Sequence, residues 1–207
     1  VKDSAGNIVD QGDATVTDKT WTYTPKVDLA DGEYTVVASA TDPAGNTGDS
    51  LPESFVVDTV GPELTIDDVE PTNDTTPTLS GTTDKDATVA VEILDKAGNI
   101  VAKGPATVDA EGNWTYTPDA ALPEGDYTIK AVATDPVGNT TTEISEVPFT
   151  VDTTAPSNTD VTIDPIDDTN DTTPAITGTT EADTKVKVVV KDSAGNIVDQ
   201  GDATVTD

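Results

Sequence analysis

The chain has 207 residues, a formal net charge of −30 and 4% aromatic residues, and it contains no Cys, Met, His or Arg. Without His or Cys, the usual general bases, thiolate nucleophiles and zinc ligands are missing, which makes an enzyme the least favoured class of function. The negative charge disfavours nucleic acid, whose phosphates would be repelled, and no apolar run approaches the ~18 residues that predict a membrane span. Cations are the natural partners of such a chain.

A tandem repeat begins at the first residue. Residues 1–18 read VKDSAGNIVDQGDATVTD and return unchanged as residues 190–207, and a looser copy, DKAGNIVAKGPATV, fills residues 95–108. The stretch WTYTP begins at Trp21 and again at Trp114. Such spacings indicate a repeated module of about 93 to 97 residues.

The copy over residues 58–151 alternates apolar and polar residues between clusters of Gly, Pro, Asn and Asp, which is typical of strands and turns. The alternation predicts seven strands, at roughly 63–67, 77–82, 87–95, 100–108, 113–118, 126–134 and 143–151. Trp114 and Tyr116 share one face of their strand and are predicted to be core, while Leu122 and Tyr127 have the spacing of a tyrosine corner. The predicted fold is all-β: tandem immunoglobulin-like, seven-strand Greek-key sandwiches arranged end to end.

The repeat divides the chain into one complete module and two partial ones. Residues 1–57 are predicted to be the C-terminal part of an Ig-like module that lacks its first strands, residues 58–151 a complete module, and residues 152–207 the N-terminal part of a module that lacks its last strands. Neither part can bury its core alone. We therefore expect two partners: neighbouring modules of the same protein, and a second copy, with residues 152–207 of one chain completing residues 1–57 of the next.

Acidic residues gather at the predicted junction between modules. In a sandwich whose strands run up and down, the linker, the loop between the second and third strands and the loop between the sixth and seventh lie at one pole. Ca²⁺ prefers carboxylate, amide and backbone oxygens, and carboxylates held close together repel unless a cation relieves them. The predicted Ca²⁺ ligands are Asp58, Asp84, Asp86, Asp135 and Asn139 in the complete module, Asp42 and Asn46 in the first part, and Asp152 and Asp183 in the last.

A metal-free interpretation of the same residues stays open. Asp and Asn are favoured in turns because their side chains bond nearby backbone, and DPxGN is a good turn sequence by itself. For Asp84 and Asp86 the alternative is a solvated loop.

As a set, the motifs resemble the bacterial Ig-like extender modules of giant secreted adhesins, including Bap-like biofilm proteins and RTX adhesins. The motifs that carry the resemblance are the VDTTAP linker, the D-P-x-G-N-T turn before the last strand, the G-T-T after the second strand and the E-G-D-Y corner. The resemblance implies export by a type I system to the bacterial surface, and Ca²⁺ at the junctions. The linker Asp of the family maps to Asp58 and Asp152, and the turn Asp to Asp42 and Asp135.

The predicted function is a non-enzymatic extender, a rod of modules stiffened by Ca²⁺ between them, which spaces a ligand-binding tip from the cell. The alternative is a self-associating biofilm module that mediates adhesion between cells. Carbohydrate binding would need an exposed aromatic platform, which the sequence does not provide.

Overall fold

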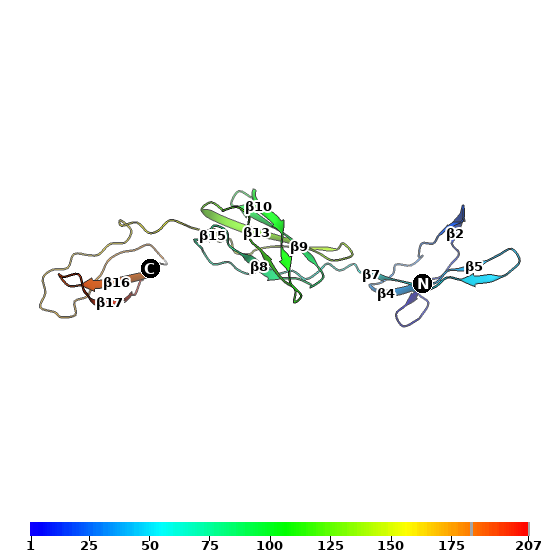
Figure 1. The fold of residues 1–207 in the computed structure, drawn as a ribbon, viewed down its shortest axis with the longest axis horizontal. Helices are drawn as coiled ribbons and strands as arrows, with labels where there is room; N and C mark the ends of the chain where they lie inside the picture. Colours follow the sequence, from blue (N-terminus) through cyan, green and yellow to red (C-terminus); the bar gives the residue numbers. More distant parts are fainter. Residues whose placement is uncertain (183, 207) are drawn as a thin grey trace. The chain divides into compact units, whose positions relative to one another are not determined.

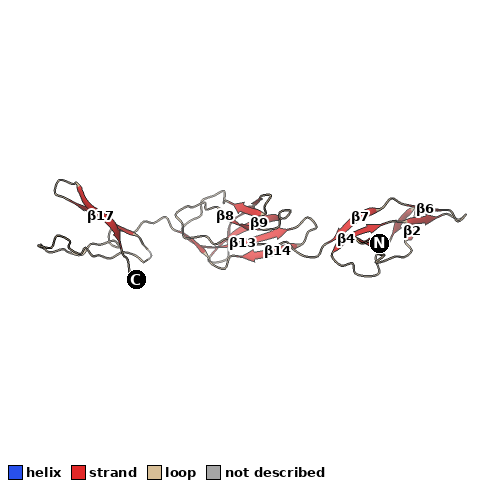
Figure 2. Cartoon of the chain, turned by 90° about the horizontal axis from the view of Figure 1, so that it is seen from below, coloured by secondary structure: helices blue, strands red, loops and turns tan. Residues whose placement is uncertain are grey.

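The computed structural model describes residues 1–182 and 184–206, which form strands and turns (Figures 1 and 2). None of these residues lies in a helix, and so none belongs to a helix that could cross a membrane. Contacts divide the chain into two compact units, Val1–Asp152 and Thr153–Asp207. The predicted all-β class is confirmed, whereas the module boundaries at 57/58 and 151/152 stay predictions.

Two antiparallel sheets make up the complete module. The larger sheet has the order β10-β9-β13-β14, with β15 also paired to β13, and the smaller has the order β11-β12-β8. Their strands are β8 (Leu79–Thr82), β9 (Thr88–Asp95), β10 (Ile100–Pro105), β11 (Thr107–Val108), β12 (Asn113–Tyr116), β13 (Gly125–Thr134), β14 (Thr140–Ile144) and β15 (Phe149–Val151). Each sheet has an apolar face that needs a second layer to cover it.

Burial follows the alternation of the sequence. Along β9 the side chains of Val89, Val91 and Ile93 are buried, and the residues between them are not. This pattern arises because successive side chains of a strand point to opposite faces. The resulting core joins both sheets and consists of Leu64, Leu79, Val89, Val91, Ile93, Trp114, Tyr116, Leu122, Tyr127, Ile129, Ala131, Ala133, Phe149 and Val151.

The aromatic residues occupy the predicted places. Trp114 is fully buried, and its indole Nε1 donates to the carbonyl oxygen of Thr65 at 2.9 Å. The Tyr127 hydroxyl donates to the carbonyl oxygen of Pro123 at 2.7 Å, and the Tyr34 hydroxyl donates to that of Ala30 at the same distance. The core position of Trp114 and the tyrosine corner are thus confirmed.

The predicted strand at 63–67 is wrong, because that segment makes only an isolated bridge between Leu64 and Thr83. The amide of Thr65 donates to the carbonyl oxygen of Thr82 at 2.8 Å, as in a ladder. The amide of Thr82, however, donates to the hydroxyl of Thr65 at 2.9 Å. A threonine side chain has therefore taken the place of a backbone acceptor, which interrupts the ladder.

Two further predicted strands are divided. The segment 100–108 is divided between β10, which ends at Pro105, and β11 of the smaller sheet, while the amide of Ala106 still donates to the carbonyl oxygen of Val89 at 2.8 Å. The segment 143–151 is broken between β14 and β15, where the amide of Ile129 bonds the hydroxyl of Ser145 at 3.0 Å in place of a backbone carbonyl. The hydroxyl of Ser145 explains the second of these differences.

Residues 1–57 form one small sheet and two hairpins. The sheet has the order β1-β4-β7, and the hairpins pair β2 with β3 and β5 with β6. The strands are β1 (Lys2–Asp3), β2 (Thr15–Thr17), β3 (Thr20–Thr22), β4 (Gly32–Val36), β5 (Ser39–Thr41), β6 (Thr47–Asp49) and β7 (Glu53–Val57). The Tyr23 hydroxyl donates to Asp10 Oδ2 at 2.6 Å, and this bond raises the pKa of Tyr23 to about 12.

The second unit contains one hairpin, β16 (Val186–Lys191) with β17 (Ile197–Ala203). Ahead of it, the amide of Thr162 donates to the carbonyl oxygen of Thr179 at 2.9 Å. This bond matches the one from the amide of Thr65 to the carbonyl oxygen of Thr82 in the complete module.

We predict that Gly81→Ala destabilises the complete module. A Cβ atom at Gly81 would lie 2.1 Å from the Thr65 carbonyl oxygen and 2.7 Å from Trp114 Nε1. The expected loss is about 1–3 kcal/mol in the free energy of unfolding, measured by urea denaturation followed by tryptophan fluorescence. Gly48→Ala is the control, because nothing lies within 4 Å of a Cβ there. Equal midpoints for the two variants would contradict this packing.

Candidate metal and junction site

The pairing of β9 with β13 brings the predicted junction loops together. Thr88 at the start of β9 lies opposite Thr134 at the end of β13, so the loop 83–87 and the turn 135–139 share one end of the sheet. The amide of Thr83 also donates to the carbonyl oxygen of Gly112 at 2.8 Å, which adds the turn that contains Asp109. The predicted pole is therefore present, with one more acidic turn than expected.

The linker between residues 1–57 and the complete module reads VDTVGP over residues 57–62, and it is bonded to this pole through Asp58 and through Glu63, which follows it. Asn139 Nδ2 donates to the carbonyl oxygen of Asp58 at 3.0 Å. Five residues further, the amide of Glu63 donates to Asp84 Oδ2 at 3.3 Å, and Thr83 Oγ1 donates to the carbonyl oxygen of Glu63 at 2.7 Å. Hydrogen bonds to backbone and side-chain atoms of the two loops thus hold the linker.

On its other side, the linker is bonded to the first part of the chain. The amide and the hydroxyl of Thr59 both donate to Asp31 Oδ1, at 3.1 and 2.9 Å. Asp31 precedes Gly32 in the turn before β4, the position that Glu124 has in the complete module. Sequence analysis missed Asp31, and the Asp-Gly pair was the signal that could have pointed to this turn.

The Asp135–Asn139 turn forms a closed set of hydrogen bonds. Asp135 Oδ1 accepts from the amides of Val137, Gly138 and Asn139 at 2.6 to 2.9 Å, and its Oδ2 accepts from Asn139 Nδ2 at 2.8 Å. Gly138 has a φ of 100°, a conformation that favours glycine. Four donors therefore engage the Asp135 carboxylate within its own turn.

The same turn occurs six times. Each copy reads Asp-x-x-Gly-Asn, with the Asn amide and side chain donating to the Asp carboxylate and the Gly at positive φ. The Asp and Asn pairs are Asp3 and Asn7, Asp42 and Asn46, Asp95 and Asn99, Asp109 and Asn113, Asp135 and Asn139, and Asp192 and Asn196. One turn serves at both ends of the module, so its carboxylate and amide are explained by local bonding.

These hydrogen bonds lower the pKa of each of the six Asp carboxylates below the ordinary value of 3.8. In five of them the largest cause is the side-chain bond from the Asn. At Asp135 desolvation is the largest single effect and raises the pKa, but the bonds from Asn139, Gly138 and Val137 together outweigh it.

The other predicted ligands are distributed unevenly. Asp84 is bonded to the linker and Asp86 lies in the same loop, whereas Asp42 lies in the turn between β5 and β6. Asp152 lies beyond the far end of β13, where its amide donates to the carbonyl oxygen of Thr72 at 2.9 Å. Asp183 is outside the described residues.

The donor chemistry of the pole is of the kind that Ca²⁺ accepts, but its arrangement does not form a ready site. Within residues 1–182 and 184–206, no three acidic side chains gather closely enough to hold a metal. The Asp135 carboxylate is already occupied by four donors. The role of the nine residues as Ca²⁺ ligands stays a prediction.

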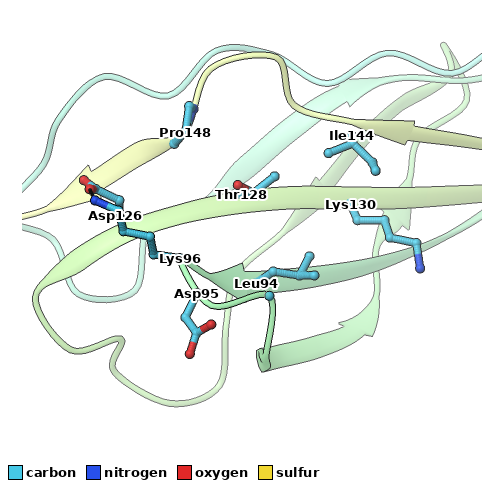
Figure 3. A pocket seen from close by; sticks show the side chains of 9 residues that line it. Leu94, Asp95, Lys96, Asp126, Thr128, Lys130, Ile144 and Pro148 are labelled. Carbon is cyan, nitrogen blue, oxygen red and sulfur yellow. Dashed lines mark ion pairs between the residues drawn. The ribbon is translucent and has the colours of Figure 1, made fainter.

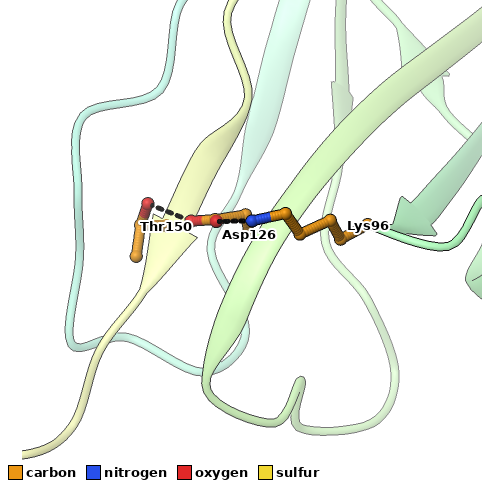
Figure 4. A network of polar contacts seen from close by, with 3 residues as sticks. All are labelled: Lys96, Asp126 and Thr150. Atoms are coloured by element: carbon orange, nitrogen blue, oxygen red, sulfur yellow. Dashed lines mark hydrogen bonds and ion pairs between the residues drawn. The ribbon is translucent and has the colours of Figure 1, made fainter.

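An open groove lies across the outer face of the larger sheet (Figure 3). Its lining includes Leu94, Thr128, Lys130 and Ile144. At its end Lys96 Nζ lies 3.8 Å from Asp126 Oδ2, and Thr150 Oγ1 donates to Asp126 Oδ1 at 2.8 Å (Figure 4). Exposed ion pairs of this length contribute little to stability. The groove contains no nucleophile paired with a base, and we assign it no chemistry.

We predict that Asp135→Ala lowers the melting temperature at pH 7 and that this difference shrinks in acid. The pKa of Asp135 is lowered on folding, so its contribution is complete above the ordinary value of 3.8 and is lost as the pH falls through the folded value. Thermal unfolding between pH 2 and pH 7 measures the difference. Asp86→Ala, which removes an exposed carboxylate at the same pole, is the control. A pH-independent difference would contradict the bonded carboxylate.

Comparisons with known proteins agree with the sandwich. The bacterial Ig-like domain family matches residues 1–59 and 66–153. Among solved structures, a tetra-tandem repeat in the extending region of a large adhesion protein is 35% identical, with a TM-score of 0.44, over 99% of this chain and 54% of that one. The chain therefore spans about half the length of that structure.

Two more distant structures are also similar. CopC from Methylosinus trichosporium OB3b is 20% identical, with a TM-score of 0.35, over 44% of this chain and 94% of that one. Dimeric latent PorU from Porphyromonas gingivalis is 22% identical, with a TM-score of 0.33, over 60% of this chain and 13% of that one. No curated protein matches the chain. The family match covers more than half of the residues, and the chain belongs to the bacterial Ig-like domain family.

Proposed function

We propose that the chain is a non-enzymatic extender segment of a large bacterial surface adhesin. The observation that carries the proposal is the repetition of one Ig-like module in tandem, with a linker bonded on both sides, through Thr59 to Asp31 and through Asp58 to Asn139. A bonded linker restricts the angle between consecutive modules. Restricted modules in series add length, which is the mechanical requirement of a spacer.

The related tetra-tandem repeat belongs to the extending region of a large adhesion protein, which agrees with this role. The agreement rests on the 35% sequence identity. We also propose that the protein lies outside the cell or on its surface. It would belong to the Bap-like or RTX adhesins and be exported by a type I system.

The extender role predicts an elongated particle. A compact domain of this length would have a radius of gyration of about 17 Å. Small-angle X-ray scattering of the 207-residue chain should give a clearly larger value, and Asn139→Ala should broaden the distribution of interatomic distances by releasing Asp58. A radius near 17 Å would contradict the role. Val137→Ala, an exposed residue of the same turn, is the control.

Ca²⁺ binding at the junction is part of the proposal as a separate step. It is supported by the net charge of −30 and by the carboxylates of Asp58, Asp84 and Asp86 near the linker. An ion would have to draw these groups together. Extracellular modules bind Ca²⁺ at about 10⁻⁴ to 10⁻³ M.

We therefore predict that millimolar Ca²⁺ raises the melting temperature and narrows the scattering distribution relative to chelator. The triple variant D58N/D84N/D86N should remove both effects. Magnesium at the same ionic strength is the control for screening. Identical melting and scattering in Ca²⁺ and in chelator would leave an extender held by hydrogen bonds alone.

The second candidate function is self-association of a biofilm module, including head-to-tail contacts between residues 1–57 and 152–207. The observation that favours it is the exposure of large apolar side chains outside the complete module, among them Trp21 and Ile176. In a monomer these apolar side chains would remain exposed to water, which is unfavourable and favours association of residues 1–57 with residues 152–207.

A further inference from the structure

Corresponding residues of the three copies differ in burial. Trp21 corresponds to Trp114, and their exposed fractions are 55% and 0%. Ile176 corresponds to Leu79, with exposed fractions of 38% and 0%. The two partial modules thus expose what the complete module buries.

The second unit already has the hydrogen bonds that, in the complete module, join the segment 65–67 to β8. Asp164 donates its amide to the carbonyl oxygen of Thr177 at 2.8 Å, and the Thr177 hydroxyl donates to Asp164 Oδ2 at 2.6 Å. In the complete module Asp67 and Ser80 make the same two bonds, at 2.9 and 2.6 Å. The close approach is also repeated, because a Cβ atom at Gly178 would lie 2.0 Å from the Thr162 carbonyl oxygen. This surface is therefore formed in advance.

In the complete module, β12 pairs with the other edge of β8. Trp114 lies opposite Gly81 in the pairing of β12 with β8, and its Nε1 reaches the Thr65 carbonyl oxygen. The residues of β12 correspond to Thr20–Tyr23, which contain β3. Among the described residues, β3 pairs only with β2. No strand there takes the place beside β3 that β8 has beside β12.

We infer that β3 of one copy pairs with residues 176–179 of a second copy, so that Trp21 lies opposite Gly178 and donates to the Thr162 carbonyl oxygen. The register follows from that of the complete module residue by residue. The association reproduces in trans the contacts that close a module in cis. In a longer array, the same contacts would join consecutive residues of one chain.

The repeated eighteen residues take part by exchange. In residues 1–57, Lys2 and Asp3 of β1 pair with Thr35 and Tyr34, which is the register of Leu94 and Asp95 on β13. Lys191 and Asp192 have the same sequence as Lys2 and Asp3. They are also continuous with the half-buried valines of β16.

Lys191 and Asp192 of an incoming tail can therefore replace β1 in its pairing with β4, because the residues that pair are the same. The tail adds Val186 and Val188, which correspond to the buried Val89 and Val91 of β9. Asp199 corresponds to Asp10 and supplies the same acceptor to Tyr23. The exchange keeps the local bonds and gains apolar burial.

The geometry of the complete module favours a second copy over closure within one chain. Residues 1–57 are joined at Asp58, which is bonded beyond the Thr134 end of β13, and the tail leaves at Val151, opposite Gly125. The ten residues of β13 separate these ends by about 34 Å. To close within one chain, the tail would have to span that distance before its residues 176–179 could reach β3.

Sedimentation velocity of the whole chain, from about 1 to 100 µM, tests the pairing. The wild type should associate with rising concentration. Trp21→Ala should weaken the association about 100-fold or more, and Ile176→Ala at least tenfold, because each removes a buried apolar anchor. Val137→Ala, an exposed apolar residue of the complete module, should associate as the wild type does.

A mixture of the two variants identifies the partners. The W21A chain keeps an intact tail, and the I176A chain keeps an intact head, so the mixture should form dimers that grow no further. Acrylamide quenching provides a second readout: Trp21 should become shielded on association, while Trp114 is buried throughout. A wild type that stays monomeric at 100 µM, or a W21A chain that associates with wild-type affinity, would overturn the inference.

The inference stands apart from the extender role. Urea denaturation of Trp114 in the same variants reports on the complete module, whose stability should not change. A monomeric chain that is still elongated in scattering would remove the pairing and retain the extender.

Discussion

Closure of the sandwich by Trp114 is the contact on which the complete module depends. Its indole lies against Gly81, where a side chain would have no room, and it bonds the carbonyl oxygen of Thr65 in the adjacent segment. This one side chain therefore joins the segment that contains Thr65 to β8 and β12, and together they form the layer that covers the larger sheet. Where the corresponding contact is absent, as at Trp21, the same sequence leaves an exposed indole and short, separate hairpins.

A second device, the Asp-x-x-Gly-Asn turn, lets an acidic chain fold without a basic partner for every carboxylate. Each turn satisfies its Asp by amide donors two to four residues away, so the charge is stabilised locally. The same turn at Asp135 has a second use, because the Asn139 amide also reaches the linker. A turn that serves the fold everywhere thus becomes a junction contact at one place.

Periodicity in the sequence was sufficient to predict the all-β class, the core face of β9, and the structural roles of Trp114 and Tyr127. These follow from local alternation, which the two-residue period of a strand imposes. The sequence did not show where a hydroxyl replaces a backbone acceptor, as Thr65 and Ser145 do, since any Thr or Ser in a Thr-rich chain could act in this way. The sequence also left two roles open for the turns at Asp42 and Asp135, because a turn and a Ca²⁺ site use the same carboxylate and amide oxygen atoms. The bond between Thr59 and Asp31 joins residues 28 positions apart, and no spacing signal announces it.

The origin of junction stiffness determines how a tandem protein responds to its surroundings. Hydrogen bonds between the linker and its neighbours are nearly independent of the ions in solution, whereas an ion site of 10⁻⁴ to 10⁻³ M empties and fills with the external Ca²⁺ concentration. In the proposed extender, the bonds through Asn139 and Asp31 would set a basal stiffness. Carboxylates near the linker repel one another at low ionic strength and would favour extension even before a cation binds, since separation lowers their mutual energy. In the proposed array, extension and cohesion would therefore depend on different residues: extension on the charged junction, and cohesion on a Trp contact like the one that Trp114 makes in the complete module.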